Sequence, residues 1–184
     1  MHVTILTSTL PCPTSPTATH GDFIWPDEAA CHAAAGQWAE VLKPALLSGH
    51  SAVIELRGTL GAGKTTFTRH LLRALGVEGR IKSPSYAVVE PHEAPGLAIW
   101  HFDFYRFNDP QEWEDAGFRD LFASAGLKLV EWPDKAAGLL PAADLALALT
   151  PIDEDRREVR AEAGTAQGQA WLSRLIQEAP PWMS

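Results

Sequence analysis

The segment Gly58 to Thr65, GTLGAGKT, has the residue types and spacing of a loop that binds phosphate groups. It fits the pattern G-x-x-x-x-G-K-[ST], in which glycines let backbone N–H groups turn toward a polyphosphate. In such a loop the Lys64 ammonium reaches the β- and γ-phosphates, and the Thr65 hydroxyl ligates Mg²⁺. The pattern requires a strand before the loop and a helix after it. The apolar run 52–57 predicts the strand, and the helical periodicity of 66–75 predicts the helix.

Two carboxylates follow apolar runs that are typical of buried strands. Glu131 comes after residues 127–130, and Asp103 comes after residues 99–102. Ligands of open α/β sheets bind beyond the carboxyl ends of the strands, where a carboxylate can hold Mg²⁺ or orient an attacking water. These residues alone leave a second interpretation open, in which both carboxylates lie at the surface beyond a strand end.

Other polar residues near these runs each allow two interpretations. His101 shares a strand face with Asp103, so it is either a core residue or a support for the site. Trp132 either stacks on a base or belongs to the core. Arg106 either meets a phosphate or pairs with an acid. The hydroxyl of Ser85, in the turn Ser-Pro-Ser, could lie near a γ-phosphate, as nucleotide-sensing loops do.

The elements around the loop predict a three-layer α/β fold with a mixed sheet. A helix is expected from Asp27 to Leu42, with Pro44 ending or kinking it. Strands are expected over 144–150 and 157–163, adjacent enough to form an antiparallel hairpin, and a closing helix over 168–178. Strands that alternate with helices around a phosphate loop favour helices on both faces of the sheet.

Length and composition favour one domain. The chain has 184 residues, of which 46% are hydrophobic, and no apolar run approaches the length of a membrane helix. Residues 1–22 are rich in Pro, Ser and Thr and predict a flexible tail, which leaves 23–184 as the domain. The first residues lack the positive start and long apolar run of a secretory signal, and Cys12 and Cys31 predict no disulfide framework. These features favour the cytoplasm and no membrane partner.

The charge is unevenly distributed. The formal net charge is −8, which argues against a surface devoted to nucleic-acid binding. From Arg57 to Lys82, however, six residues are basic and one is acidic, whereas from Asp103 to Asp120 six are acidic and two are basic. The basic segment surrounds the phosphate loop and suits an anionic ligand.

Four motifs in this order resemble the TsaE (YjeE) family, the small ATPase of bacterial tRNA threonylcarbamoyladenosine biosynthesis. They are GTLGAGKTT at 58–66, KSPSY at 82–86, HFDFYR at 101–106 and VEWP at 130–133. The resemblance covers about Phe23 to Ala163 and is weaker in the closing helix. It implies a P-loop NTPase fold with a partly antiparallel sheet.

The resemblance also implies roles for individual residues in binding ATP and Mg²⁺. Thr65 and Glu131 would hold Mg²⁺, and Asp103 would act with Lys64 in catalysis, on the water that attacks ATP. The nucleotide would be bound by the following residues: Glu28, Gly61, Ala62, Gly63, Lys64, Thr65, Thr66, Ser85, Trp132 and Arg157. Two positions depart from the family pattern, since Thr59 replaces a loop aspartate and Ser85 replaces a threonine.

Partners follow from the resemblance as well. Proteins of this family act with TsaD and TsaB on adenosine 37 of tRNAs that read ANN codons, so tRNA would be met indirectly through the complex. Two other functions stay open on the same fold: a small-molecule kinase, and an assembly factor gated by nucleotide. A kinase typically carries an arginine-bearing lid, and no arginine-rich loop follows residues 118–124.

Overall fold

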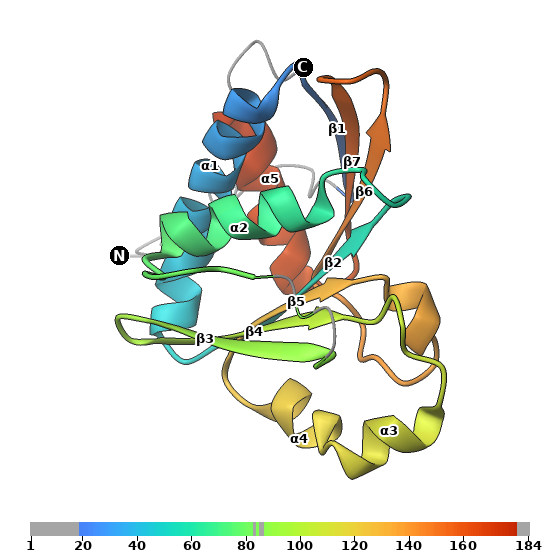
Figure 1. Cartoon of the computed structure of the whole chain (residues 1–184). Helices are drawn as coiled ribbons and strands as arrows, with labels where there is room; N and C mark the ends of the chain where they lie inside the picture. The colour runs from blue at the N-terminus through green and yellow to red at the C-terminus, as the bar shows by residue number, and fades with distance from the viewer. Residues whose placement is uncertain (1–18, 83, 85–86, 180–184) are drawn as a thin grey trace, which may run out of the picture.

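The computed structural model describes residues 19–82, 84 and 87–179. One seven-stranded sheet lies between α1, α2 and α5 on one face and α3 and α4 on the other, which confirms the three-layer α/β prediction (Figure 1). The strands are β1 (His20–Trp25), β2 (Ser51–Arg57), β3 (Val89–Ala94), β4 (Leu97–Asp103), β5 (Gly126–Glu131), β6 (Leu145–Pro151) and β7 (Arg157–Ala163). The helices are α1 (Glu28–Leu47), α2 (Lys64–Leu75), α3 (Pro110–Asp115), α4 (Phe118–Ala123), the short 3₁₀ helix η1 (Pro133–Ala136) and α5 (Ala166–Glu178). No helix in the described ranges combines the length and the apolar character that a membrane crossing requires.

The sheet has a parallel centre and antiparallel edges, in the order β1-β7-β6-β2-β5-β4-β3. Strands β6, β2, β5 and β4 run parallel, whereas β7, β1 and β3 each pair antiparallel with their neighbours. The expected hairpin of β6 and β7 is therefore confirmed, as is the mixed sheet. In the parallel centre Glu131 lies level with Leu56 on one side and with Asp103 on the other. The carboxyl ends of these three strands thus meet at one edge of the sheet.

Strand β1 begins at His20, three residues before the domain start expected at Phe23. It pairs with β7 along its whole length and buries Phe23 and Trp25. Gly21 and Asp22 are poor strand formers, so local propensity gave no signal. The strand is held by a partner more than a hundred residues away in the sequence. Residues 1–18 lie outside the described residues.

Helix α1 is longer than its sequence predicted. The expected end at Leu42 is wrong, because the helix continues through Pro44 to Leu47. Proline removes one backbone hydrogen bond. Here the loss falls near the end of the helix, where burial of Leu46 stabilises the last turn. At the start, the Asp27 side chain accepts a hydrogen bond from the Ala30 N–H and caps the helix.

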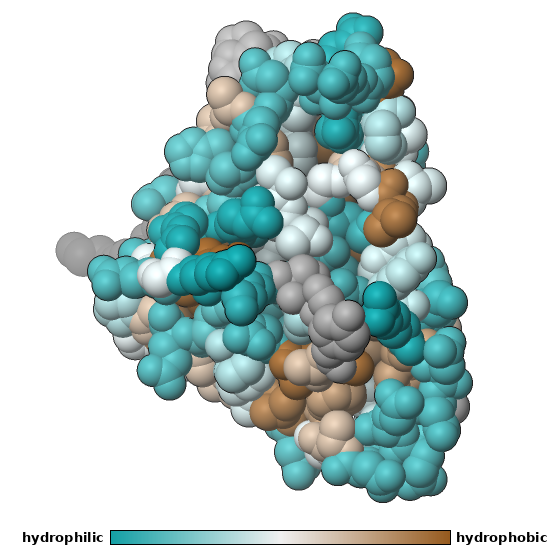
Figure 2. All heavy atoms as spheres, in the orientation of Figure 1, coloured by the Kyte–Doolittle hydropathy of each residue, from teal (hydrophilic) through white to brown (hydrophobic). Residues whose placement is uncertain are grey.

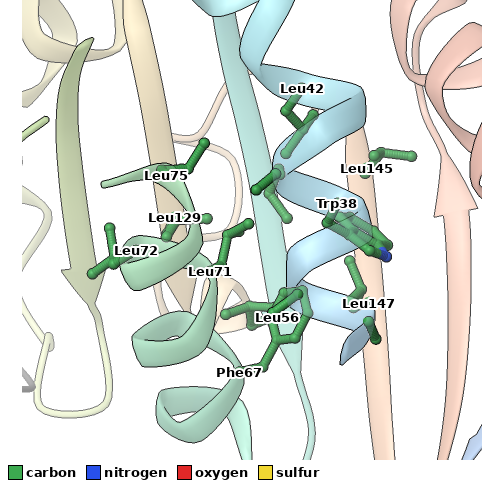
Figure 3. Packing of buried hydrophobic residues seen from close by; sticks show 14 of the residues in the cluster. Trp38, Leu42, Leu56, Phe67, Leu71, Leu72, Leu75, Leu129, Leu145 and Leu147 are labelled. Carbon is green, nitrogen blue, oxygen red and sulfur yellow. The ribbon is translucent and has the colours of Figure 1, made fainter. Parts of the chain in front are cut away.

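Two apolar clusters hold the layers together. The larger one lies between the sheet and helices α1 and α2, where Trp38, Phe67 and Leu71 meet Leu56 and Leu129 (Figure 3). The smaller one is aromatic and lies between the sheet and helices α3 and α4; hydrophobic residues gather near those helices in Figure 2. In α5, Trp171, Leu172 and Leu175 are buried, whereas Ile176 is 37% exposed. The two clusters fix the positions of β2, β4, β5 and α2, which carry the candidate site.

Candidate functional site

The glycine loop connects the end of β2 to the start of α2, as its sequence predicted. Gly58 has a φ of 141°, and a Cβ atom there would lie 2.5 Å from the backbone oxygen of Leu149 in β6. Gly61 and Gly63 also have positive φ values, and Gly63 is the residue that caps α2. Only glycine adopts such backbone angles without strain. The loop therefore wraps the amino end of α2, where N–H groups and the helix dipole attract anions.

Lys64 reaches back over this loop. Its side chain is almost fully buried, and its ammonium donates hydrogen bonds of 2.9 Å to the carbonyl oxygens of Gly58 and Thr59. The same ammonium lies 4.0 Å from the centre of the Trp132 ring. Burial lowers the pKa of Lys64, while the nearby carboxylates of Glu131 and Asp103 oppose that shift.

Glu131 connects α2 with β4 through both of its carboxylate oxygens. Oε2 accepts a hydrogen bond of 3.0 Å from the Thr65 hydroxyl, and Oε1 lies 2.9 Å from His101 Nε2. Both Glu131 and His101 are buried, so the contact between them is shielded from bulk water. The carboxylate at the end of β5 is thus not a surface group. This removes the surface interpretation for Glu131.

Asp103 lies at the end of β4, beside Glu131 in the register of the sheet. Its Oδ1 accepts a hydrogen bond of 3.0 Å from the Tyr105 N–H. It lines one hollow together with the phosphate loop and Glu131. That hollow is formed by Leu60, Gly61, Gly63, Lys64, Thr65, Thr66, Asp103, Tyr105, Glu131 and Trp132. The two carboxylates and the loop, which are distant in sequence, therefore share one hollow.

A second hollow lies on the other side of the loop, toward α1 and the β6–β7 hairpin. It contacts the loop at Ala62, Gly63 and Thr66 and has about 520 Å³ of empty space. The rest of its lining is Trp25, Asp27, Glu28, Cys31, Leu149, Glu154, Asp155 and Arg157. Gly63 and Thr66 line both hollows, so the two lie next to each other along the loop.

Arg157 and Glu28 approach the second hollow from different elements. Arg157 Nε donates a hydrogen bond of 3.0 Å to the carbonyl oxygen of Ala62, which ties β7 to the loop. Its Nη1 also donates to carbonyl oxygens in the β6–β7 turn. Glu28, in the first turn of α1, lies 3.1 Å from His70 Nε2 on α2. The structure therefore places Glu28 and Arg157 at one hollow, although 129 positions separate them in the sequence.

The remaining candidates have different outcomes. Trp132 lies beside the loop in a left-handed backbone conformation, with φ of 57°, and its ring centre is 4.9 Å from that of Tyr105. Ser85 lies outside the described residues. Arg106 does not line either hollow.

Several lining residues were not expected from the sequence. Leu60 and Tyr105 line the first hollow, and Glu154 and Asp155 line the second. The one sequence signal for Glu154 and Asp155 was that they lie close to Arg157, a residue expected at the site. Within the described part of the chain, no three His, Cys, Asp or Glu side chains converge in a way that would hold a metal ion by themselves.

Comparison with known proteins identifies the family. Residues 25–159 match the family model described as "Threonylcarbamoyl adenosine biosynthesis protein TsaE". A tRNA threonylcarbamoyladenosine biosynthesis protein TsaE from Haemophilus influenzae is 39% identical over 148 residues, which are 80% of this chain and 92% of that protein. The namesake from Bacillus subtilis is 36% identical over 107 residues, 58% of this chain and 66% of that protein.

The fold agrees with a solved structure. The crystal structure of YdiB from Bacillus subtilis matches 88% of this chain and 97% of its own, with a TM-score of 0.68 and 24% sequence identity. Identity at that level supports the fold alone, which is consistent with a P-loop NTPase. The family match and the relatives carry the assignment: this chain belongs to the TsaE family, in tRNA threonylcarbamoyladenosine biosynthesis.

Proposed function

We propose that this protein binds ATP and Mg²⁺ and hydrolyses ATP in support of tRNA threonylcarbamoyladenosine biosynthesis. The observation that carries the proposal is the hollow where Lys64, Thr65, Asp103 and Glu131 meet at the amino end of α2. A buried cation, a hydroxyl and two carboxylates around a glycine loop are the groups that phosphoryl transfer from a nucleotide requires.

The donor set at the end of β5 fits Mg²⁺. The Thr65 hydroxyl oxygen and Glu131 Oε2 lie 3.0 Å apart, and both are oxygen ligands of the kind that Mg²⁺ prefers. Since no cluster of three acidic or imidazole groups converges in the described residues, the protein would supply few ligands, as is usual where phosphates and waters complete the shell. Bound there, Mg²⁺ would neutralise charge that develops on the phosphates.

The loop would hold the phosphates and the second hollow the nucleoside. Backbone N–H groups between Gly61 and Thr66 would bind the phosphate oxygens. Lys64 would exchange its two carbonyl partners for phosphate oxygens. Glu28 and Arg157 line the hollow beside the loop, where the nucleoside would lie. Trp132 would lie beside the phosphates, and Ser85, which is outside the described residues, would also contact the nucleotide.

Asp103 would act on the water that attacks the terminal phosphate. It lies beside Glu131 in the sheet and lines the same hollow as the loop residues Leu60 and Gly61. A carboxylate in that place accepts a hydrogen bond from a water and orients it. Asp103 would thereby position the nucleophile, while Lys64 stabilises charge on the phosphates.

The partners proposed here are those with which proteins of the TsaE family act. We propose that the ATP cycle supports turnover by TsaD and TsaB homologues, with tRNA contacted through the complex and the protein located in the cytoplasm. The net charge of −8 is consistent with partners that make most of the contact with RNA.

The test compares Asp103→Asn with wild type in phosphate release from γ-labelled ATP. Turnover should fall about 10²-fold or more, because a group that positions the nucleophile contributes at least this much. Nucleotide affinity should stay near wild type, since asparagine has the size and shape of aspartate and the proposed phosphate contacts come from the loop. Asp120→Asn, on the exposed side of α4, serves as the matched control. Unchanged turnover would favour a nucleotide-gated assembly factor, and label found on a metabolite would favour a kinase.

A further inference from the structure

His101 is a buried polar residue that the phosphate site does not use directly. It lies in β4, is 0% exposed, and places Nε2 2.9 Å from Glu131 Oε1. A carboxylate only accepts hydrogen bonds, so Nε2 carries the proton and donates it. Glu131 then has one oxygen engaged by His101 and the other by the Thr65 hydroxyl. The chain of contacts runs from β4 through β5 to the first turn of α2.

Apolar packing alone does not explain an imidazole at position 101. Its Nδ1 is buried and has no hydrogen-bond partner among the described residues. A buried polar atom without a partner costs about 1–3 kcal/mol. The neighbouring positions on the same face, Ile99 in β4 and Leu129 in β5, are apolar and fully buried, so a leucine at 101 would suit the layer. The contact with Glu131 is what sets His101 apart from them.

We infer that His101 is a positioning residue for Glu131: its Nε2–H holds Oε1, so that Oε2 stays directed at Thr65 and the hollow. A glutamate has three rotatable bonds, and a carboxylate held at one oxygen keeps fewer orientations. Hydrogen bonds of this kind orient the ligands of a metal and typically change its affinity about 10–100-fold. This inference rests on the proposed function, because it concerns how Glu131 is presented to Mg²⁺.

The experiment measures binding of a fluorescent ADP analogue to the full chain at increasing Mg²⁺ concentration. His101→Leu removes the donor, and His101→Gln restores an N–H near the position of Nε2. The Mg²⁺ concentration at half-effect should rise about 10–100-fold in His101→Leu and stay near wild type in His101→Gln. Affinity without Mg²⁺ should be unchanged in both, which a general loss of structure would not produce.

His92→Leu is the matched control. His92 lies on the edge strand β3, opposite Ile99, and its Nε2 is also buried without a partner among the described residues. Strand β4 lies between β3 and β5, and among the described residues no hydrogen bond joins His92 to Glu131, so its replacement should leave the Mg²⁺ dependence unchanged. If His101→Leu does not fold, His101→Asn replaces it in the comparison with His101→Gln. Both side chains are then polar amides, but asparagine is shorter and does not reach Glu131.

The outcomes separate the two proposals. If wild type binds the nucleotide with an Mg²⁺ effect, and His101→Leu or His101→Asn shows the same effect as His101→Gln, the role of His101 is overturned while the proposed function stands. If wild type binds no nucleotide, or shows no Mg²⁺ effect, both are overturned. A shift in the donor-lacking variant that glutamine reverses supports the inference.

Discussion

At the scale of single residues, the Lys64 ammonium contacts three neutral groups. It donates to the carbonyl oxygens of Gly58 and Thr59 and lies over the Trp132 ring. Each of these partners is neutral, whereas a polyphosphate is strongly anionic. If a polyphosphate replaced these partners, the hydrogen bonds of Lys64 would become charge-assisted and stronger.

Replacement of Lys64 by alanine should weaken ATP binding about 10–100-fold and abolish hydrolysis, since hydrogen bonds to a charged group contribute about 1.5–3 kcal/mol. Titration calorimetry with a non-hydrolysable ATP analogue measures the change. Lys43→Ala, in α1 and away from both hollows, is the control. Wild-type affinity in Lys64→Ala would rule out the role given to the loop.

Glu131→Gln should raise the Mg²⁺ concentration needed for half-maximal hydrolysis by about tenfold or more, because an amide is a weaker Mg²⁺ ligand than a carboxylate. The fold should be retained, since glutamine has the same shape. Glu112→Gln, on the exposed side of α3, is the control. An Mg²⁺ profile equal to that of wild type would exclude Glu131 as a ligand.

Some residues of the site could be predicted from the sequence, and others could not. The loop has a local pattern, and Asp103 and Glu131 each follow an apolar run, so their positions at strand ends were predictable. The contact of His101 with Glu131 was not, because it requires β4 and β5 to be neighbours. Nothing in residues 97–131 specifies that pairing locally.

At the scale of elements, the close approach of β6 restricts the conformation of the phosphate loop. Gly58→Ala would place a Cβ atom 2.5 Å from the Leu149 oxygen and 3.0 Å from the Ala62 Cβ, at a φ of 141°. We expect a loss of about 3 kcal/mol or more in the free energy of unfolding, with loss of nucleotide binding. Chemical denaturation provides the measurement.

Gly36→Ala is the matched control, and it should change the free energy of unfolding in the opposite direction. Gly36 lies in the interior of α1, and a Cβ atom there would meet nothing within 4 Å. Alanine should raise the free energy of unfolding by about 0.5–1 kcal/mol through helix propensity. If both substitutions had the same effect, the strain assigned to position 58 would be wrong.

Most elements could be predicted because their periodicity is local, whereas the missed strand β1 and the misplaced end of α1 have tertiary causes. Strand β1 starts at His20 with residues of low strand propensity and is specified by pairing with β7. Helix α1 passes through Pro44 because packing of Leu46 outweighs the local signal to stop. Local propensity predicts an element poorly where contacts with residues distant in the sequence stabilise it.

At the scale of the whole molecule, the end of the sheet opposite the loop buries a cation. Lys128 is fully buried in β5 and donates to Ser51 Oγ and to the carbonyl oxygens of Ser124 and Gly126. Burial lowers the pKa of Lys128 to about 8. The unfolded chain holds this proton up to a pKa near the ordinary value of about 10.4.

Stability should therefore depend on pH in alkaline solution. Below about pH 8 both states are protonated and the cost of the buried charge is fully present. Between about pH 8 and 10.4 the unfolded chain binds the extra proton, so the free energy of unfolding rises with pH, by up to about 3 kcal/mol. Denaturation of wild type and Lys128→Met at several pH values isolates this contribution, with Lys43→Met as the control. Parallel curves for wild type and Lys128→Met would contradict it.

The central claim is that this protein uses ATP to sustain tRNA modification by its partners. The direct measurement is reconstitution with TsaD and TsaB homologues, threonylcarbamoyl-adenylate, tRNA and ATP, counting modified adenosines per TsaD. The wild-type protein should drive many modifications per TsaD, whereas Asp103→Asn, which retains nucleotide binding, should allow about one. A count that stays near one with the wild-type protein, or that is equally high with Asp103→Asn, would contradict the account.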